Sequence, residues 1–175
     1  MSDLQQSPIG DEFFRQSSEL LDQSIIKIRH CLAQLSISQI WWRPHPALNS
    51  IGNLILHIAG NLKQWGVVPL TNKADERNRD AEFSSDKPIT ADTLLQELHQ
   101  VTSQAKLLWN QVASKRLVER FSIQGFDVSL LEAIMHTSSH FVGHTHQIIL
   151  LTRMQLGEKY RFQWSPADKR GQLPI

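Results

Sequence analysis

Apolar side chains recur every three or four residues in four separate stretches of the chain, spanning residues 11–35, 51–65, 90–114 and 129–157. This spacing is typical of one face of an amphipathic helix. No stretch alternates apolar and polar residues convincingly, so the pattern predicts no strand. Four helices, with one long connection between the second and the third, indicate an all-α fold, a four-helix bundle.

Helix-capping residues mark where two of these helices begin. Asn49 or Ser50 precedes the second apolar stripe and is the expected N-cap there. Ser129 and Glu132 have the spacing of a capping box, in which a hydroxyl and a carboxylate satisfy exposed backbone donors reciprocally. The fourth helix should therefore begin directly after Ser129 and end at Gly157.

The segments between and after the helices lack an apolar period. Residues 36–46 contain two prolines and should break the first helix, forming at most a short turn of their own. Residues 71–88 are polar and dense in charge, which predicts a long surface loop. Residues 115–127 form a connection of undefined shape, and residues 158–175 should fold back on the bundle as a tail. The aromatic residues of this tail are Tyr160, Phe162 and Trp164.

The net charge narrows the classes of function. The chain has 175 residues, with 18 Lys+Arg against 17 Asp+Glu and a formal net charge of +1. Residues 1–175 are expected to form one domain. A charge so close to zero argues against a nucleic-acid binder, which normally presents a basic surface. There is no run of 18 apolar residues and no signal-peptide pattern at the start, so we expect neither a membrane-spanning nor an exported protein.

The cysteine content favours an intracellular setting. Cys31 is the only cysteine, which excludes internal disulfides and a cage of several thiolates, and fits a reducing cytoplasm. It falls on the apolar stripe of the first helix, where a buried packing role is favoured over that of a nucleophile. The pair Trp41 and Trp42 is likewise expected to pack against the end of the bundle rather than to wall a ligand pocket.

Four of the eight histidines lie between His136 and His146. His136, His140 and His144 are each four residues apart, so they follow one stripe of the fourth helix. On a helical wheel His144 lies nearest the apolar arc and His136 lies farthest from it. We therefore expect His140 and His144 to face inward as a pair. His136 should lie nearer the rim or solvent, and His146 should point elsewhere.

A third ligand for a metal ion would come from a facing helix of the bundle. His57 is the candidate, because it lies beside the apolar stripe of the second helix, with Asn53 and Asn61 one turn to either side. Three neutral imidazoles leave coordination positions open, as in a catalytic site rather than a closed structural one. An ion in such a site lowers the pKa of bound water to about 7, or activates a bound thiol.

A second interpretation of the histidine spacing stays open. A histidine on an apolar helix face is more often a hydrogen-bonded core residue than a ligand. His140 and His144 also lack the glutamate that marks zinc proteases, since residues 141–143 are Phe-Val-Gly. The spacing alone therefore does not decide between metal binding and core packing.

Residues 49–61 read NSIGNLILHIAGN, and the pattern H-x-x-x-H-x-x-Q-I stands at residues 140–148. Both segments resemble the DinB/YfiT-like superfamily of bacterial bundle proteins. The sequence RNRDAEF at residues 77–83 resembles the corresponding loop of one uncharacterised branch of that superfamily. The resemblance extends from the first helix to about Phe162.

The resemblance implies a four-helix bundle with a divalent ion, often nickel or zinc, held by His57, His140 and His144. Characterised members of the superfamily are thiol-dependent transferases or isomerases, and many are homodimers, while other members have no known activity. A low-molecular-weight thiol is therefore an implied co-substrate. The chain departs from the superfamily at His146, where a glycine is common. An imidazole at that position alters the face that a partner helix would contact.

Several polar residues are candidates for a pocket beside the metal ligands. The charged loop at residues 77–83 has two open interpretations, a solvated surface and a pocket or dimer role. Trp65 lies one turn beyond Asn61 and is placed to reach the mouth of the site or to fill the core. The candidate pocket residues are Asn53, Asn61, Trp65, Arg79, Asp80 and Glu82.

These features together predict a metal-dependent enzyme with transferase-like or hydrolase-like chemistry on a small electrophile. With Cys31 expected in the core, any thiol would be supplied from outside. The expected partners are a small-molecule substrate and a second copy of the chain, without nucleic acid or a membrane. The alternative is a non-catalytic bundle that binds an ion for stability or serves as an interaction module.

Overall fold

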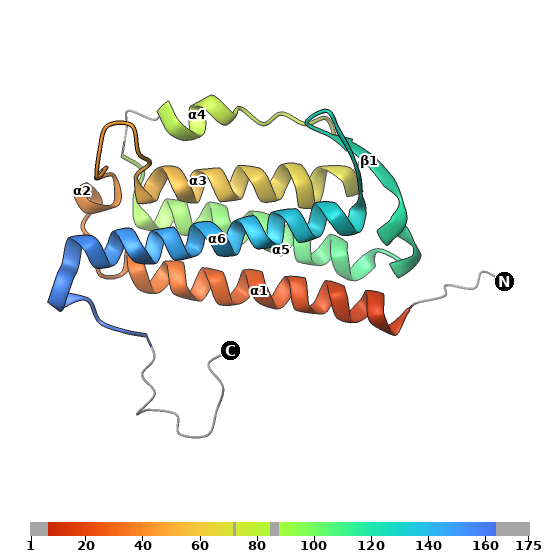
Figure 1. Ribbon diagram of the computed structural model, residues 1–175, viewed down its shortest axis with the longest axis horizontal. Coiled ribbons are helices and arrows are strands. Elements are labelled where there is room, and N and C mark those ends of the chain that lie inside the picture. The colour runs from red at the N-terminus through yellow and green to blue at the C-terminus, as the bar shows by residue number, and fades with distance from the viewer. Residues whose placement is uncertain (1–6, 72, 85–87, 164–175) are drawn as a thin grey trace, which may run out of the picture.

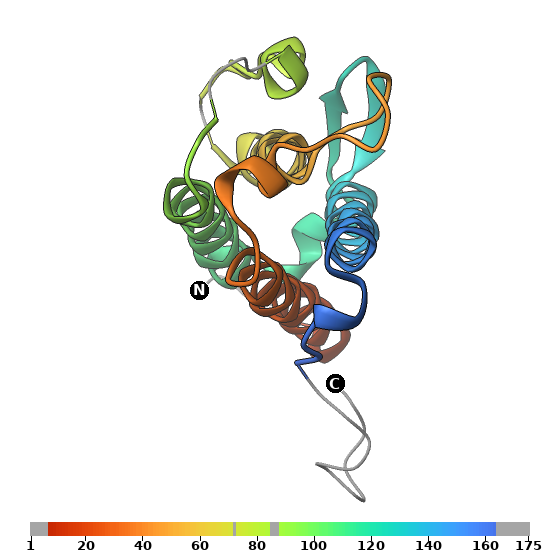
Figure 2. The ribbon, with the colours of Figure 1, turned by 90° about the vertical axis from the view of Figure 1, so that its left-hand side faces the viewer.

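Four helices form the bundle in a computed structural model that describes residues 7–71, 73–84 and 88–163 (Figure 1). Viewed end-on, they form a ring in the order α1, α6, α3, α5, and each helix packs on the next (Figure 2). The bounds are Pro8–Leu32 for α1, Ile51–Leu62 for α3, Ala91–Gln111 for α5 and Leu130–Leu156 for α6. The predicted all-α four-helix bundle is confirmed.

The helix directions require one long return connection. In Figure 1, α1 and α6 run from right to left, whereas α3 and α5 run from left to right. The chain must therefore travel back along the bundle between the end of α3 and the start of α5. This connection contains the short helix α4, Arg79–Ser84, which packs on α3. The expectation of a long surface loop over residues 71–88 is wrong in this part, because residues 79–84 form a helix and Glu82 within it is buried.

The apolar stripes read from the sequence face the middle of the bundle. Burial of these side chains is the main favourable term for folding, because it removes apolar surface from water. Cys31 is fully buried among them, which confirms its packing role. The fully buried apolar residues include Leu21, Ile28, Ile58, Leu98, Ile134 and Ile148.

The helix starts follow the predicted caps. Ser50 rather than Asn49 is the N-cap of α3, and its hydroxyl accepts a hydrogen bond from the backbone N–H of Asn53 at 3.1 Å. At the start of α6, the backbone N–H of Ser129 donates to Glu132 Oε2 at 2.6 Å and the Ser129 hydroxyl accepts from the Glu132 backbone at 3.1 Å. Both starts are complete capping boxes.

The turn between α1 and α3 contains a single short helix, α2, Ile37–Ile40. Trp41 follows it and packs flat against the start of α3, where a Cβ added to Gly52 would lie 2.8 Å from three atoms of the indole. The Trp41 indole N–H also donates to the carbonyl of Ile89 at 3.0 Å. Trp41 therefore has the expected packing role, while Trp42 is 39% exposed.

The connection between α5 and α6 contains a hairpin that the sequence analysis does not predict. A 3₁₀ turn at Ser114–Val118 leads into strand β1, Arg120–Ile123, which pairs antiparallel with β2, Phe126–Ser129. The two turn residues, Gln124 and Gly125, both have positive φ, 53° and 82°. This is the conformation that a two-residue hairpin turn requires, and the glycine was the signal for it. Strands of four residues are too short to show a clear alternation.

The last turns of α3 and the tail complete the described structure. A π-helical turn at Lys63–Val67 extends α3 and buries Trp65. In the tail, the Tyr160 ring meets the His30 ring of α1 edge to face at 6.1 Å, but Phe162 is 66% exposed. The expected packing of Trp164 lies outside the described residues. None of the helices in the described ranges has the length and apolar character that a membrane span needs.

The contact between Trp41 and Gly52 predicts a specific loss of stability. Gly52→Ala forces a methyl group into the indole, and such overpacking lowers the free energy of unfolding by about 1–3 kcal/mol. Gly143→Ala is the matched control, because its Cβ meets nothing within 4 Å and α6 gains helix propensity. Denaturant titration of both variants checks this. Equal stability of the two would contradict the packing of Trp41 on α3.

Candidate metal centre

Three histidines from two helices converge at one point of the bundle. His57 lies in the middle of α3, and His140 and His144 lie one turn apart on the neighbouring helix α6. Each histidine offers one ring nitrogen to a group whose members all lie within 4.8 Å of one another. The His57 and His140 Nε2 atoms are 2.9 Å apart. This arrangement can hold one metal ion.

The contacts at the outer ring nitrogens fix which nitrogen faces the centre. His57 Nδ1 lies 2.9 Å from Glu82 Oε2, and His144 Nδ1 lies 2.8 Å from Gln147 Oε1. A carboxylate or amide oxygen only accepts, so these two contacts require each Nδ1 to carry the proton and donate it; Arg77 Nη2 also lies 3.2 Å from His57 Nδ1, farther away than Glu82 Oε2. The Nε2 lone pairs of His57 and His144 are then free for a metal ion or a shared proton. This is the tautomer that a histidine ligand bound through Nε2 requires.

Burial favours the neutral form of two of the three imidazoles, because it lowers the pKa values of His140 and His144. His57 is 7% exposed, and His140 and His144 are partly buried. Burial, together with the nearby His144, His57, His136 and Arg77, lowers the pKa of His140 to about 3. Burial also lowers the pKa of His144. Neutral imidazoles are the form that binds metal ions, so no proton has to be removed from His140 or His144 at neutral pH.

A buried ion pair from the return connection supports His57. Glu82 of α4 is 8% exposed, and Arg77 binds both of its oxygens, with Nε 2.7 Å from Oε1 and Nη2 2.9 Å from Oε2. Burial alone would raise the pKa of Glu82, but hydrogen bonds from His57 and Arg77 outweigh it and hold that pKa below its ordinary value. The carboxylate therefore stays ionised beside His57.

Four of the candidate pocket residues form other contacts and no hydrogen bond with the three histidines among the described residues; they are Asn53, Asn61, Arg79 and Asp80. Asn53 caps α3 and donates from Nδ2 to the Glu82 carbonyl at 2.9 Å. Asn61 accepts from the Thr137 hydroxyl at 2.9 Å. Arg79 and Asp80 are exposed on α4, with Arg79 placed over the Phe83 ring. In the charged loop at residues 77–83, Glu82 Oε2 contacts His57 Nδ1, and Arg77 Nη2 lies 3.2 Å from the same nitrogen.

A stack of three aromatic rings borders the centre. Trp65 lies against His136 at 4.2 Å between ring centroids, and His136 stacks on His140 at 5.7 Å. His136 itself is exposed, as is His146. Trp65 is buried under the hairpin with Ile123, so it both fills the core and reaches the edge of the site.

Gln64 is a site residue that the sequence analysis misses, and Arg77 is one that it includes only as part of the charged loop at residues 77–83. Arg77 Nη1 donates to Gln64 Oε1 at 2.8 Å, and Gln64 Oε1 also accepts from Gln124 of the hairpin turn at 2.6 Å. These bonds join the return connection, α3 and the hairpin around the ion pair. Arg77 is a charged residue in a segment without an apolar period, and Gln64 is a polar residue between the apolar positions of its helix, so spacing gives no sign that either is buried.

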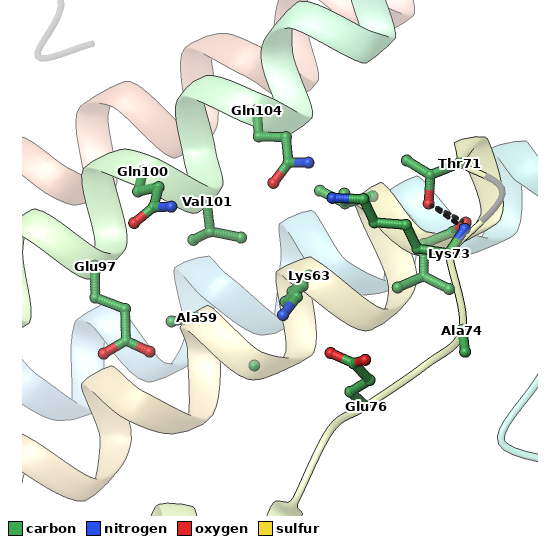
Figure 3. Close-up of a pocket in the computed structure, with 13 residues that line it drawn as sticks. Ala59, Lys63, Thr71, Lys73, Ala74, Glu76, Glu97, Gln100, Val101 and Gln104 are labelled. Atoms are coloured by element: carbon green, nitrogen blue, oxygen red, sulfur yellow. Dashed lines mark hydrogen bonds between the residues drawn. The ribbon is translucent and has the colours of Figure 1, made fainter.

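A separate pocket of about 600 Å³ lies between α3, α5 and the first part of the return connection (Figure 3). Charged side chains of both signs point into it, namely Lys63, Lys73, Glu76 and Glu97. Burial raises the pKa of Glu97. The volume is that of a small-molecule site, yet none of the three histidines lines it.

Residues 8–168 match the protein family described as "Protein of unknown function (DUF1572)". The chain belongs to this family. The DUF1572 match covers all four long helices, and therefore the three histidines, together with the return connection that carries Arg77 and Glu82. No curated protein and no solved structure matches the chain.

Proposed function

We propose that the protein is a divalent-metal-dependent enzyme of the DinB/YfiT-like kind, with His57, His140 and His144 as the protein ligands. The observation that carries the proposal is the convergence of three ring nitrogens within 4.8 Å from two facing helices. Imidazole ligands suit zinc and nickel, which the resemblance also favours. A three-histidine set leaves at least one coordination position for water or substrate.

The chemistry follows from that open position. A divalent ion bound there would lower the pKa of a coordinated water or thiol and so supply a nucleophile at neutral pH. Glu82 holds the proton at His57 Nδ1, and Arg77 keeps Glu82 ionised. Cys31 is fully buried, which supports a thiol supplied from outside, such as a low-molecular-weight thiol. We infer transferase-like or hydrolase-like chemistry on a small electrophile.

Other parts of the proposal rest on the resemblance and on composition. They are a homodimeric assembly and a cytoplasmic location.

A non-catalytic, metal-stabilised bundle is the second candidate, and one observation favours it. The 600 Å³ pocket is not lined by the histidines, so the concavity suited to a small molecule and the candidate metal centre are separate features.

Metal content is the first test of this proposal. Protein purified without a histidine tag should carry about one zinc or nickel ion per chain. His140→Ala should lose most of it, whereas His146→Ala should keep it, because His146 is exposed on the same helix and is not one of the three converging histidines. Elemental analysis of all three proteins checks this. A wild-type content below half an equivalent, unchanged in His140→Ala, would contradict the metal site.

Turnover is the second test. Metal-loaded protein should consume a model electrophile in the presence of one of several cellular thiols, and a chelator should abolish this activity until the ion is restored. Cys31→Ala should retain the activity, because the native thiol is buried and does not reach the substrate. Stoichiometric metal binding without turnover across the panel would favour the non-catalytic bundle.

A further inference from the structure

The return connection docks on α3 at a position that only glycine allows. A Cβ added to Gly60 would overlap Glu82 Oε1 and would lie 3.0 Å from Arg77 Nε. Gly60 lies in the last turn of α3, which the π-helical turn at Lys63–Val67 continues, and glycine inside a helix costs about 1 kcal/mol of helix propensity relative to alanine. The missing side chain is therefore what lets the Arg77–Glu82 ion pair lie directly against the helix beside His57.

Several further contacts hold this part of the connection in place. Asn53 Nδ2 donates to the Glu82 carbonyl at 2.9 Å, and Arg43 Nη2 donates to the Phe83 carbonyl at 2.8 Å. The Phe83 ring lies 5.0 Å from the His57 ring, centroid to centroid. Glu82 is thus positioned by Asn53 of α3, by Arg43 of the segment between α2 and α3 and by its own helix α4, and not by His57 alone.

Arg77 already satisfies both carboxylate oxygens of Glu82, so the hydrogen bond from His57 is an additional one. The His57–Glu82 hydrogen bond therefore matters for His57 rather than for Glu82. The bond fixes the proton on Nδ1, orients the ring and leaves Nε2 directed at His140. A carboxylate that accepts from the outer nitrogen of a ligand histidine raises the basicity of that ligand and typically contributes roughly 10–100-fold to metal affinity.

We propose that Glu82 is a positioning residue of the metal centre and that metal binding is coupled to the docking of residues 77–84 on α3. The inference rests on the proposed function, since it requires an ion at His57. Docking presents the carboxylate that prepares His57 for the ion. By reciprocity, a bound ion strengthens the His57–Glu82 hydrogen bond and stabilises the docked connection.

Zinc affinity of charge-matched variants tests the positioning role. We expect Glu82→Gln to bind zinc roughly 10–100-fold more weakly than wild type in competition with a chelating dye. Asp80→Asn removes the same charge from an exposed position of the same short helix and should bind zinc as wild type does. Zinc binding by wild type with an unchanged affinity in Glu82→Gln would overturn this inference alone. Failure of wild type to bind zinc would overturn the proposed function and this inference with it.

A steric variant separates position from charge. Gly60→Ala leaves every ionisable group in place but displaces Glu82 and Arg77, so its zinc affinity should fall as in Glu82→Gln. Gly143→Ala is the matched helix glycine, with open space at its Cβ, and should keep wild-type affinity. A Gly60→Ala protein that folds, as judged by circular dichroism, and binds zinc normally would contradict the proposal.

Hydrogen exchange tests the coupling directly. Zinc should slow amide exchange in residues 77–84 of wild type, because opening of the docked connection then also weakens zinc binding. The same protection should be absent or much reduced in Glu82→Gln at saturating zinc. Equal protection of the segment in both proteins would show that Glu82 does not transmit the effect.

Discussion

The close approach of His57 and His140 between α3 and α6 is the constraint on which the site depends. Their Nε2 atoms are 2.9 Å apart, and burial keeps His140 neutral. Two neutral imidazole nitrogens at this distance repel unless a proton or a cation lies between them. Because His57 Nδ1 donates its proton to Glu82, one cation at the centre could contact the inward nitrogens of all three histidines at once. The bundle supplies this geometry because α3 and α6 are neighbours in the ring.

Periodicity was sufficient to predict the bundle and the convergence of the histidines. An apolar stripe that recurs every three to four residues determines which helix face is buried, and a wheel then places every other residue relative to it. His140 and His144 border the apolar stripe of α6, and His57 borders that of α3, so both sets meet where the two helices pack. The caps at Ser50 and Ser129 followed from local hydrogen bonding alone.

The residues and segments that surround the three histidines could not be predicted from periodicity. Glu82 is buried by an ion pair and a glycine contact, and neither leaves a periodic signal in a segment that reads as solvated. The two hairpin strands have four residues each, too few for an alternating pattern to be recognised in the sequence. Gln124 and Gly125 between them form the tight turn, and the glycine was the one local sign of it. The π-helical turn at Lys63–Val67 has no signal in the apolar spacing either. Long-range polar contacts thus complete a site whose three candidate ligand histidines follow from the spacing of residues along each helix.

The local environment of a bound zinc ion tests the central claim most directly. X-ray absorption of the zinc-loaded protein should show three imidazole nitrogens at about 2.0–2.1 Å, oxygen in the remaining position and no sulfur. In His57→Ala the imidazole count should fall, because α3 then contributes no ligand. A zinc–sulfur distance of about 2.3 Å would contradict the account. So would an unchanged imidazole count in His57→Ala, because either result places the ion elsewhere.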